Sequence, residues 1–294
     1  MNKMLEKTVI DKGILDIKMI EQAAENLSAV VQFTPLMRSE ALSERYECNV
    51  WLKREDLQKV RSYKIRGAYN KMASLDRSLL EQGVVCASAG NHAQGVALSC
   101  RLMQVPGTIY MPNTTPNQKV KKVEFFGREF VTIHLTGDNF DDCYRVAIAD
   151  SKANNKVFIH PFDDPYIIAG QGTVGLEILQ KANTWDIDYL FLPIGGGGLA
   201  SGVGSIFKHK SPQTRVIGLE PEGAPSMYES LRQGHLITLD HIDPFVDGAA
   251  VKRVGEYTYE ICKEVVDDIH LIPEGKVCST ILQMYNEEAI VVEP

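Results

Sequence analysis

The sequence predicts an α/β protein with two open, twisted and mainly parallel sheets flanked by helices. Short apolar runs alternate with helical patterns along the chain, which is typical of βαβ units around a parallel sheet. The runs form two series, and 294 residues are more than one small core needs. We therefore expect two sheets in two domains; one large α/β domain with a lobe is the alternative.

Each series of apolar runs indicates the strands of one sheet. The first series comprises Val50–Leu52, Val84–Ala87, Thr108–Met111 and Phe130–Ile133. The second comprises Val157–Ile159, Tyr189–Ile194, Val216–Leu219 and Ile269–Ile272. The predicted smaller domain spans residues 50–154, and the larger domain combines residues 1–49 with 155–294.

An amphipathic helix is predicted over residues 16–31, before the first strand. Its apolar side chains recur at helical spacing, at Ile17, Ile20, Ala24, Leu27 and Val31. The dipeptide Thr34-Pro35 ends the pattern. This helix is expected to pack on the second sheet, which makes the larger domain discontinuous.

The composition excludes several classes of function. A net charge of −7 and a pI near 5.6 argue against a nucleic-acid partner, because phosphate binding requires a basic face. The six cysteines are scattered without a Cys-x-x-Cys pair, which indicates reduced thiols rather than disulfides or a zinc site. No signal peptide or membrane-spanning run is recognisable. We expect a cytoplasmic protein without membrane contact.

A run of four glycines follows the apolar run Tyr189–Ile194 and precedes a predicted helix, Leu199–Lys208. The run consists of Gly195, Gly196, Gly197 and Gly198. Without Cβ atoms the backbone N–H groups can converge on an anion, toward which the helix also points its positive end. A flexible turn needs only one or two glycines, and neither the P-loop nor the G-x-G-x-x-G pattern fits. The run therefore predicts a phosphate cradle.

A second candidate anion site follows the predicted strand Val84–Ala87, where another helix is expected to begin. It consists of Ser88, Ala89, Gly90, Asn91 and His92. Small residues and free N–H groups at a helix start suit a carboxylate, and Asn91 adds an amide donor. His92 is either a general base or a residue that orients the loop, so no catalytic role is assigned to it.

Lys64 lies in the segment Ser62–Ala68, after the polar stretch Lys53–Asp56. The helix dipole disfavours a lysine at a helix start, and most lysines are solvated surface residues. A lysine that is buried near a phosphate, however, has a lowered pKa and becomes a nucleophile toward carbonyl groups.

The three segments, in this order, resemble those of the fold-type II pyridoxal-phosphate enzymes, whose fold is like that of tryptophan synthase β. They read Ser-Tyr-Lys-Ile-Arg-Gly-Ala, Ser-Ala-Gly-Asn-His-Ala-Gln-Gly and Gly-Gly-Gly-Gly-Leu. Within that group the sequence is similar to the biosynthetic threonine dehydratases, also called threonine ammonia-lyases. The resemblance runs from Phe33-Thr34-Pro35-Leu36 to Glu293-Pro294. It implies a cofactor cleft between the two domains.

The resemblance implies a role for each segment. Lys64 would bind pyridoxal phosphate covalently, and Tyr63, at a position that is commonly Phe in the family, would face the cofactor ring. Gly195–Leu199 would hold the cofactor phosphate. Asn91 would hydrogen-bond the ring hydroxyl, and Ser88–His92 would bind the substrate carboxylate.

The implied reaction is the dehydration and deamination of L-threonine to 2-oxobutyrate and ammonia, the first step of isoleucine biosynthesis. Lys64 would remove the α-proton, and the cofactor phosphate would help the β-hydroxyl to leave. L-Serine would react more slowly, since one methyl group contributes about 1–3 kcal/mol of discrimination. Serine racemases carry a serine where this chain has Ala89, so little racemisation is expected.

No metal ligand is assigned in the sequence. Glu220 matches a cation ligand of some relatives, but the second carboxylate that they use is Ser226 here. We therefore expect no tight divalent site. The expected partners are an amino-acid substrate and, in a homo-oligomer, further copies of the chain.

Other interpretations are a serine racemase, a serine dehydratase or a threonine synthase of the same fold. An inactive fragment that survives as a binding module and a nucleotide-binding protein are alternatives from other classes. The colour of the purified protein and its products from threonine and serine would distinguish these interpretations.

The chain is expected to lack a C-terminal part of the larger domain, because the family continues for many residues beyond Ala289–Pro294. That continuation supplies a helix, a strand and a loop whose Ser or Cys contacts the pyridine nitrogen. Ala289–Pro294 is expected to form the end of a strand. We expect the 294 residues alone to be poorly active and prone to association through an unpaired sheet edge.

Overall fold

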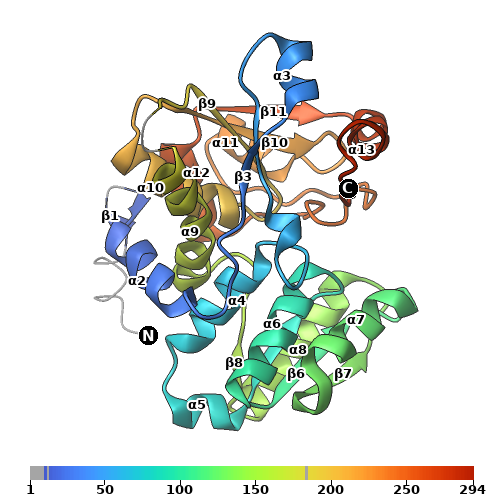
Figure 1. The fold of residues 1–294 in the computed structure, drawn as a ribbon. Coiled ribbons are helices and arrows are strands. Elements are labelled where there is room, and N and C mark those ends of the chain that lie inside the picture. The colour runs from blue at the N-terminus through green and yellow to red at the C-terminus, as the bar shows by residue number, and fades with distance from the viewer. Residues whose placement is uncertain (1–9, 12, 183–184) are drawn as a thin grey trace.

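The computed structural model describes residues 10–11, 13–182 and 185–294. Figure 1 shows two lobes, with α4 (Lys64–Ala73) and α9 (Pro165–Lys181) at the level where they meet. Each lobe contains one parallel sheet, and helices flank both sheets. The predicted fold class is therefore confirmed.

The first sheet has the strand order β7-β6-β5-β8. Its strands are β5 (Val84–Ala87), β6 (Gly107–Met111), β7 (Val131–Leu135) and β8 (Val157–Phe158). The flanking helices are α5 (Arg77–Gln82), α6 (Asn91–Met103), α7 (Asn117–Gly127) and α8 (Phe140–Ala153), and the 3-10 turn η2 (Arg128–Phe130) precedes β7. On β5, Val84 and Cys86 pack toward α6, whereas Val85 and Ala87 pack toward α8. Both faces of β5 are buried, which explains why it is apolar at every position.

The second sheet has the order β11-β10-β9. Its strands are β9 (Tyr189–Pro193), β10 (Arg215–Pro221) and β11 (Asp268–Ile272). The helices of this lobe are α10 (Gly198–Lys210), α11 (Ser226–Gln233), α12 (Glu256–Val265) and α13 (Glu274–Glu288). Leu192, Val216 and Ile269, one from each strand, share a core with Val203 of α10. This lobe therefore has a core of its own.

The N-terminal segment belongs mainly to the second lobe. Its elements are β1 (Ile10–Asp11), β2 (Ile14–Leu15), α2 (Ile17–Leu27), β3 (Leu36–Arg38), α3 (Glu40–Tyr46), β4 (Trp51–Lys53) and the 3-10 turn η1 (Glu55–Leu57). Ile20 and Ala23 of α2 are buried in the core that also contains the strands of the second sheet, and α2 packs there against α9 and α10. The helix ends at Leu27 rather than at residue 31, because the Ser28 side chain and amide both bond the Glu25 carbonyl.

Three strand predictions are wrong. β4, in the run Val50–Leu52, pairs antiparallel with β3 and not with the first parallel sheet. β8, in the run Val157–Ile159, pairs with β5 in the first sheet and not in the second. Ala289–Pro294 forms no strand: Ala289 is left-handed, with φ 53°, and ends α13 before an irregular tail. Short apolar runs carry no pattern that selects their hydrogen-bonding partner, so the tertiary structure decides their sheet.

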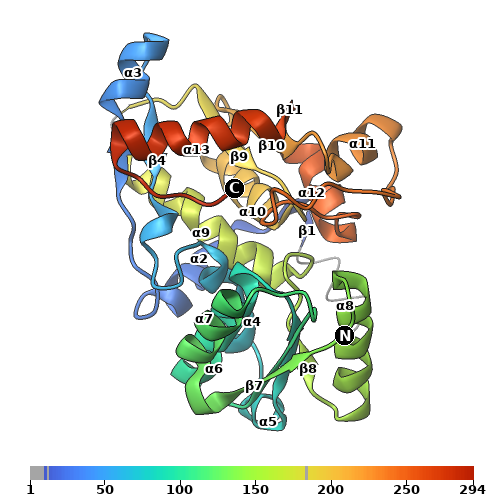
Figure 2. The same ribbon diagram turned by 90° about the vertical axis from the view of Figure 1, so that its right-hand side faces the viewer.

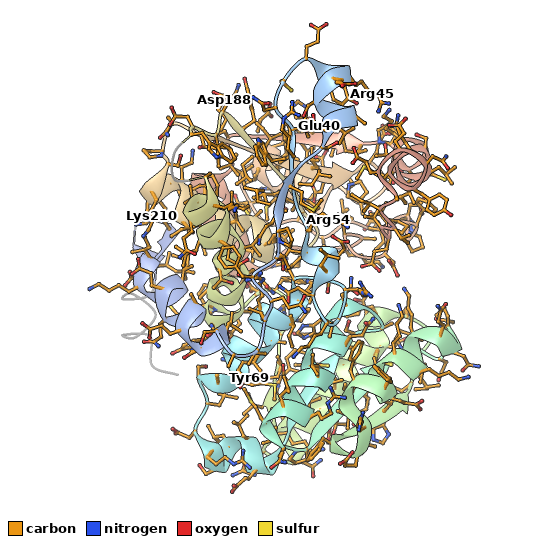
Figure 3. All side chains as sticks on the ribbon, viewed as in Figure 1. Glu40, Arg45, Arg54, Tyr69, Asp188 and Lys210 are labelled. Carbon is orange, nitrogen blue, oxygen red and sulfur yellow. The ribbon has the colours of Figure 1, made fainter. Side chains whose placement is uncertain are left out.

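Several ion pairs lie on the surface of the described chain. The ion pair between Lys210 and Glu21 (3.1 Å) lies at the periphery, where Figure 3 labels Lys210. Such exposed pairs contribute little to stability. Within the described residues, no helix is long and apolar enough to cross a membrane.

Candidate active site

Lys64 is the first residue of α4, and its ammonium lies in a desolvated position. Nζ donates a hydrogen bond to the Pro161 carbonyl (3.2 Å) and lies 5.4 Å from the centre of the Tyr63 ring. In the described chain no carboxylate forms an ion pair with it. Burial without a countercharge lowers the pKa of Lys64 to about 8. A substantial fraction of the amine is therefore unprotonated, and hence nucleophilic, at slightly alkaline pH.

The four glycines form a tight turn between β9 and α10. Gly197 has φ 90°, which only glycine adopts without strain, and a methyl group on Gly196 would overlap the Phe162 ring. The N-terminus of α10 has no side-chain cap, so its first N–H groups are free to bind an anion. Leu199 is buried in the core, so only its backbone can face such an anion.

The connection between β8 and α9 brings the lysine and the glycines together. Pro161 accepts the hydrogen bond from Lys64, and the neighbouring Phe162 packs on Gly196. His160 Nδ1 accepts from the amides of Phe162 (3.2 Å) and Asp163 (2.7 Å), which holds this connection in place. The sequence analysis missed these residues. Their place after the carboxyl end of a parallel strand was the signal that could have found them.

The segment Ser88–His92 follows β5 and opens α6, as predicted. Ser88 Oγ accepts from the Gly90 amide (3.2 Å), which shapes the turn. Gly90 precedes α6 without a side-chain cap, so this helix also presents free N–H groups. The turn can therefore bind a carboxylate, and Ala89 adds no polar group to it.

His92 is held in one orientation. Its Nε2 bonds the Ile159 carbonyl (2.9 Å) and must donate, because a carbonyl oxygen only accepts. Nδ1 is buried without a hydrogen-bond partner among the described residues. Burial, and secondarily the charge of Lys64, lowers the pKa of His92 to about 3. The ring is neutral near pH 7, so the structure favours the orienting role over that of a general base.

The amide of Asn91 already has a partner in this structure. Its Nδ2 donates to the carboxylate of Glu293, in the tail that runs back from α13 toward the centre of the molecule (Figure 2). Burial and the same carboxylate raise the pKa of Tyr63 to about 12. Glu293 is therefore a neighbour of both predicted cofactor contacts, and the sequence analysis did not anticipate it.

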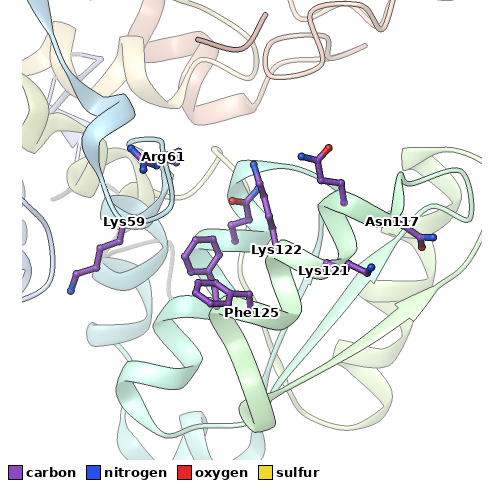
Figure 4. Close-up of a pocket in the computed structure, with 9 residues that line it drawn as sticks. Lys59, Arg61, Asn117, Lys121, Lys122 and Phe125 are labelled. Atoms are coloured by element: carbon purple, nitrogen blue, oxygen red, sulfur yellow. The ribbon is translucent and has the colours of Figure 1, made fainter. Parts of the chain in front are cut away.

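A surface pocket adjoins this region without containing its predicted residues. Figure 4 shows Lys59 and Arg61 on one side of it and Asn117, Lys121, Lys122 and Phe125 of α7 on the other. Gln94 of α6 also lines it. The pocket is basic and open, and it is distinct from the surroundings of Lys64.

The residues present fit an aldehyde that carries a phosphate. Lys64 offers a nucleophilic amine, and the turn at Gly196 and Gly197 offers space and N–H groups for an anion. Ser62 Oγ, two residues before the lysine, is buried without a hydrogen-bond partner in the described chain, as is His92 Nδ1. Buried polar atoms left unpaired are what a bound ligand would satisfy.

The two-sheet fold, the buried Lys64 and the glycine turn together define a protein of the pyridoxal-phosphate class. The chain belongs to the family of pyridoxal-phosphate-dependent enzymes, whose family model matches residues 27–294. The expected family and cofactor are thereby confirmed.

Within this family the chain is similar to proteins with one shared name, L-threonine dehydratase biosynthetic IlvA. The protein of Halalkalibacterium halodurans is 58% identical over 282 residues, which are 96% of this chain and 68% of that protein. The Bacillus subtilis protein is 56% identical over 284 residues, 97% of this chain and 67% of that protein. The resemblance to threonine dehydratases is thus confirmed.

Two solved structures share the fold. The processed form of threonine deaminase isoform 2 from Solanum lycopersicum superimposes with a TM-score of 0.88 at 41% identity, covering 97% of this chain and 78% of that one. Maize serine racemase superimposes with a TM-score of 0.90 at 33% identity, covering 95% and 83%.

Proposed function

We propose that this enzyme deaminates L-threonine to 2-oxobutyrate and ammonia, as in the first step of isoleucine biosynthesis. The names and high identity of its relatives support the reaction. The observation that carries the proposal is the connection between β8 and α9. Through Pro161 and Phe162 it places a lysine of lowered pKa beside an uncapped glycine turn.

Lys64 is the proposed catalytic residue. Bound pyridoxal phosphate withdraws electrons from the Cα atom of an amino acid. Lys64 Nζ would hold the cofactor and, once free, would accept the α-proton, which a pKa near 8 allows at physiological pH. The carbonyl of Pro161 would keep Nζ oriented during that transfer.

The remaining predicted residues have binding roles in this proposal. The N–H groups of Gly195–Leu199 would hold the cofactor phosphate, and Tyr63 would support the cofactor ring. Asn91 would donate its amide to the ring hydroxyl after exchanging Glu293 for the cofactor. The turn from Ser88 to His92, whose shape the Ser88 hydroxyl helps to hold, would bind the substrate carboxylate.

Product analysis tests the proposed function. The holoenzyme should form 2-oxobutyrate from L-threonine and pyruvate from L-serine, with roughly 10- to 200-fold lower kcat/KM for serine because one methyl contact is lost. Equal rates with both substrates, or no keto acid from either, would contradict the proposal.

A serine racemase is the second candidate, because the maize enzyme has so similar a fold. Ala89 has no acid group that could protonate the opposite face of a substrate, so we expect D-serine to form far more slowly than pyruvate. Chiral chromatography after incubation with L-serine measures both products. D-Serine that accumulates as fast as pyruvate would identify a racemase.

We also propose that the enzyme is cytoplasmic and homo-oligomeric. The domain bounds predicted from the sequence, 50–154 for the smaller domain and 1–49 with 155–294 for the larger, would each shift. β4 pairs with β3 of the N-terminal segment, so the first boundary would fall after Lys53, and β8 extends the first sheet, so the second would fall after Phe158. Tyr189 and Phe191 are exposed on the outer strand β9 and stack with centres 6.2 Å apart, which supports self-association there. Sedimentation velocity would give the oligomeric state.

A further inference from the structure

We propose that Arg66 and Gln171 are positioning residues for Lys64, and that together they fix the first turn of α4 on α9. The proposal rests on the proposed role of Lys64. Arg66 lies two residues after Lys64, so its side chain projects from the face of α4 opposite to that of Lys64. It makes no contact with the Lys64 amine, and any effect on the chemistry would act through the position of the helix.

Arg66 is fully buried and holds two carboxylates at once. Nε and Nη2 bond the two oxygens of Glu55, both at 2.8 Å. Nη1 and Nη2 bond the two oxygens of Glu177 on α9, at 2.6 and 3.0 Å. Lys53 Nζ bonds Glu177 (2.5 Å) and lies 3.8 Å from Glu55, so the four charges balance. Two forked contacts in different directions leave the guanidinium little freedom to move.

Gln171 accepts a hydrogen bond from a backbone amide near the start of α4. The residue before the helix, Tyr63, gives no side-chain cap. Instead the side-chain oxygen of Gln171, which is buried on α9, accepts from the Gly67 amide in the first turn (3.2 Å). One of the orphan amides of α4 is thus satisfied from another helix. The backbones approach so closely that a methyl group on Gly170 would lie 2.6 Å from the Arg66 carbonyl.

Helix α9 also contacts α10, the helix that follows the glycine turn. On α9, Gly172 meets Gly202 of α10 in a second close crossing, where a methyl group on Gly172 would lie 3.0 Å from the Gly202 carbonyl. α9 is therefore in backbone contact both with the helix that begins at Lys64 and with the helix that begins at Gly198. We infer that α9 sets the separation between the lysine amine and the N-terminus of α10.

Two variants test this inference without leaving a net charge in the core. Gln171→Met keeps the side-chain volume and removes the acceptor for Gly67. The double variant Arg66→Met/Glu177→Gln removes both forks of the guanidinium but leaves Lys53 and Glu55 as a neutral pair. If the double variant does not fold, Gln171→Met still decides the question.

The first measurement is the pKa of Lys64 in the cofactor-free full chain, from competitive acylation mapped by peptide mass spectrometry across pH. The wild type should titrate at about 8. In the variants a looser first turn admits water to the ammonium, so the pKa should rise toward its ordinary value of about 10.4. In the holoenzymes, kcat for L-threonine should fall at least about 10-fold with KM changed less than about threefold, since orientation is lost and binding is retained.

Two controls separate positioning from general loss of stability. Arg77→Met/Glu81→Gln removes an exposed ion pair (3.1 Å) on α5 and should change neither quantity. Val123→Ala creates a buried cavity in α7 and should lower the melting temperature without moving the pKa of Lys64. If Gln171→Met leaves the Lys64 pKa and kcat at wild-type values, or Val123→Ala moves the pKa equally, the inference is wrong. The proposed function fails separately, if the wild-type holoenzyme forms no adduct on Lys64 and no 2-oxobutyrate.

Discussion

Asn91 and Glu293 are 202 residues apart in sequence, yet the amide of one donates a hydrogen bond to the carboxylate of the other. The contact joins the start of α6 to the tail that follows α13. It brings an anion to the residue proposed to bind the cofactor ring. Burial, and secondarily the same anion, raises the pKa of Tyr63. Glu293 and the cofactor would therefore compete for one donor.

We predict that Glu293→Ala tightens cofactor binding about fivefold, because one competing hydrogen bond contributes about 1 kcal/mol. Titration of the cofactor-free chain with pyridoxal phosphate, followed by absorbance, gives the dissociation constant. Glu287→Ala is the matched control, since Glu287 pairs with Arg45 at the surface. Weaker binding by Glu293→Ala would mean that the carboxylate supports the cofactor instead of competing with it.

Lys64→Ala should abolish 2-oxobutyrate formation while the glycine turn retains some cofactor non-covalently. After borohydride reduction, intact mass and peptide mapping should place the pyridoxyl group on Lys64 of the wild type and nowhere on the variant. Lys59→Ala, in the exposed loop before α4, is the control and should keep the adduct. An adduct on any other lysine of the wild type would refute the assignment.

The lowered pKa of Lys64 also predicts how stability depends on pH. Below about pH 8 the Lys64 amine is charged in both the folded and the unfolded chain. In that range the burial of the charge lowers the free energy of unfolding by its full amount. Between about pH 8 and 10.4 the unfolded chain holds a proton that the folded chain has lost, so this group's contribution to stability rises with pH. Urea unfolding of the cofactor-free chain should show that rise, and Lys64→Met should flatten it. Parallel curves would contradict the buried position of the amine.

His92→Gln should leave the shape of the kcat/KM profile unchanged between pH 5 and 9. The pKa of His92 is lowered to about 3, so its ring does not titrate in that range. The glutamine amide can still donate to the Ile159 carbonyl, and we expect the plateau to fall less than about 10-fold. An acid limb near pH 6.5 that disappears in His92→Gln would show that His92 is a catalytic base after all.

Millimolar Mg²⁺ should bind this enzyme only weakly at Glu220. Both carboxylate oxygens already accept backbone amides, from Met227 (2.7 Å) and Tyr228 (2.8 Å), at the start of α11. Ser226 offers a hydroxyl where a second carboxylate would be needed. Isothermal titration should find no site tighter than about 1 mM, and Ser226→Asp should strengthen binding. A micromolar site in the wild type would overturn this prediction.

Much of the architecture could be predicted because it depends on local order in the sequence. The continuous apolar run Val84–Ala87 indicates a strand that is buried on both faces, and the structure has β5 there. Four glycines after Tyr189–Ile194 predicted a turn into a helix, and α10 begins at Gly198. Such patterns reflect side-chain burial and backbone freedom, which neighbouring residues determine.

Contacts between distant segments could not be predicted in this way. Nothing in the dipeptide Val157-Phe158 shows that it pairs with β5. A strand pairs with whichever sheet edge lies next to it in the folded chain, and that depends on the tertiary structure. The lowered pKa of Lys64 likewise comes from a desolvated position beside Pro161, 97 residues away. The sequence alone therefore determined which residues are the candidates for the chemistry and in what order they follow along the chain. Only the tertiary structure decided their burial, their charge and their partners, because these depend on dielectric surroundings and contacts that form when the chain folds.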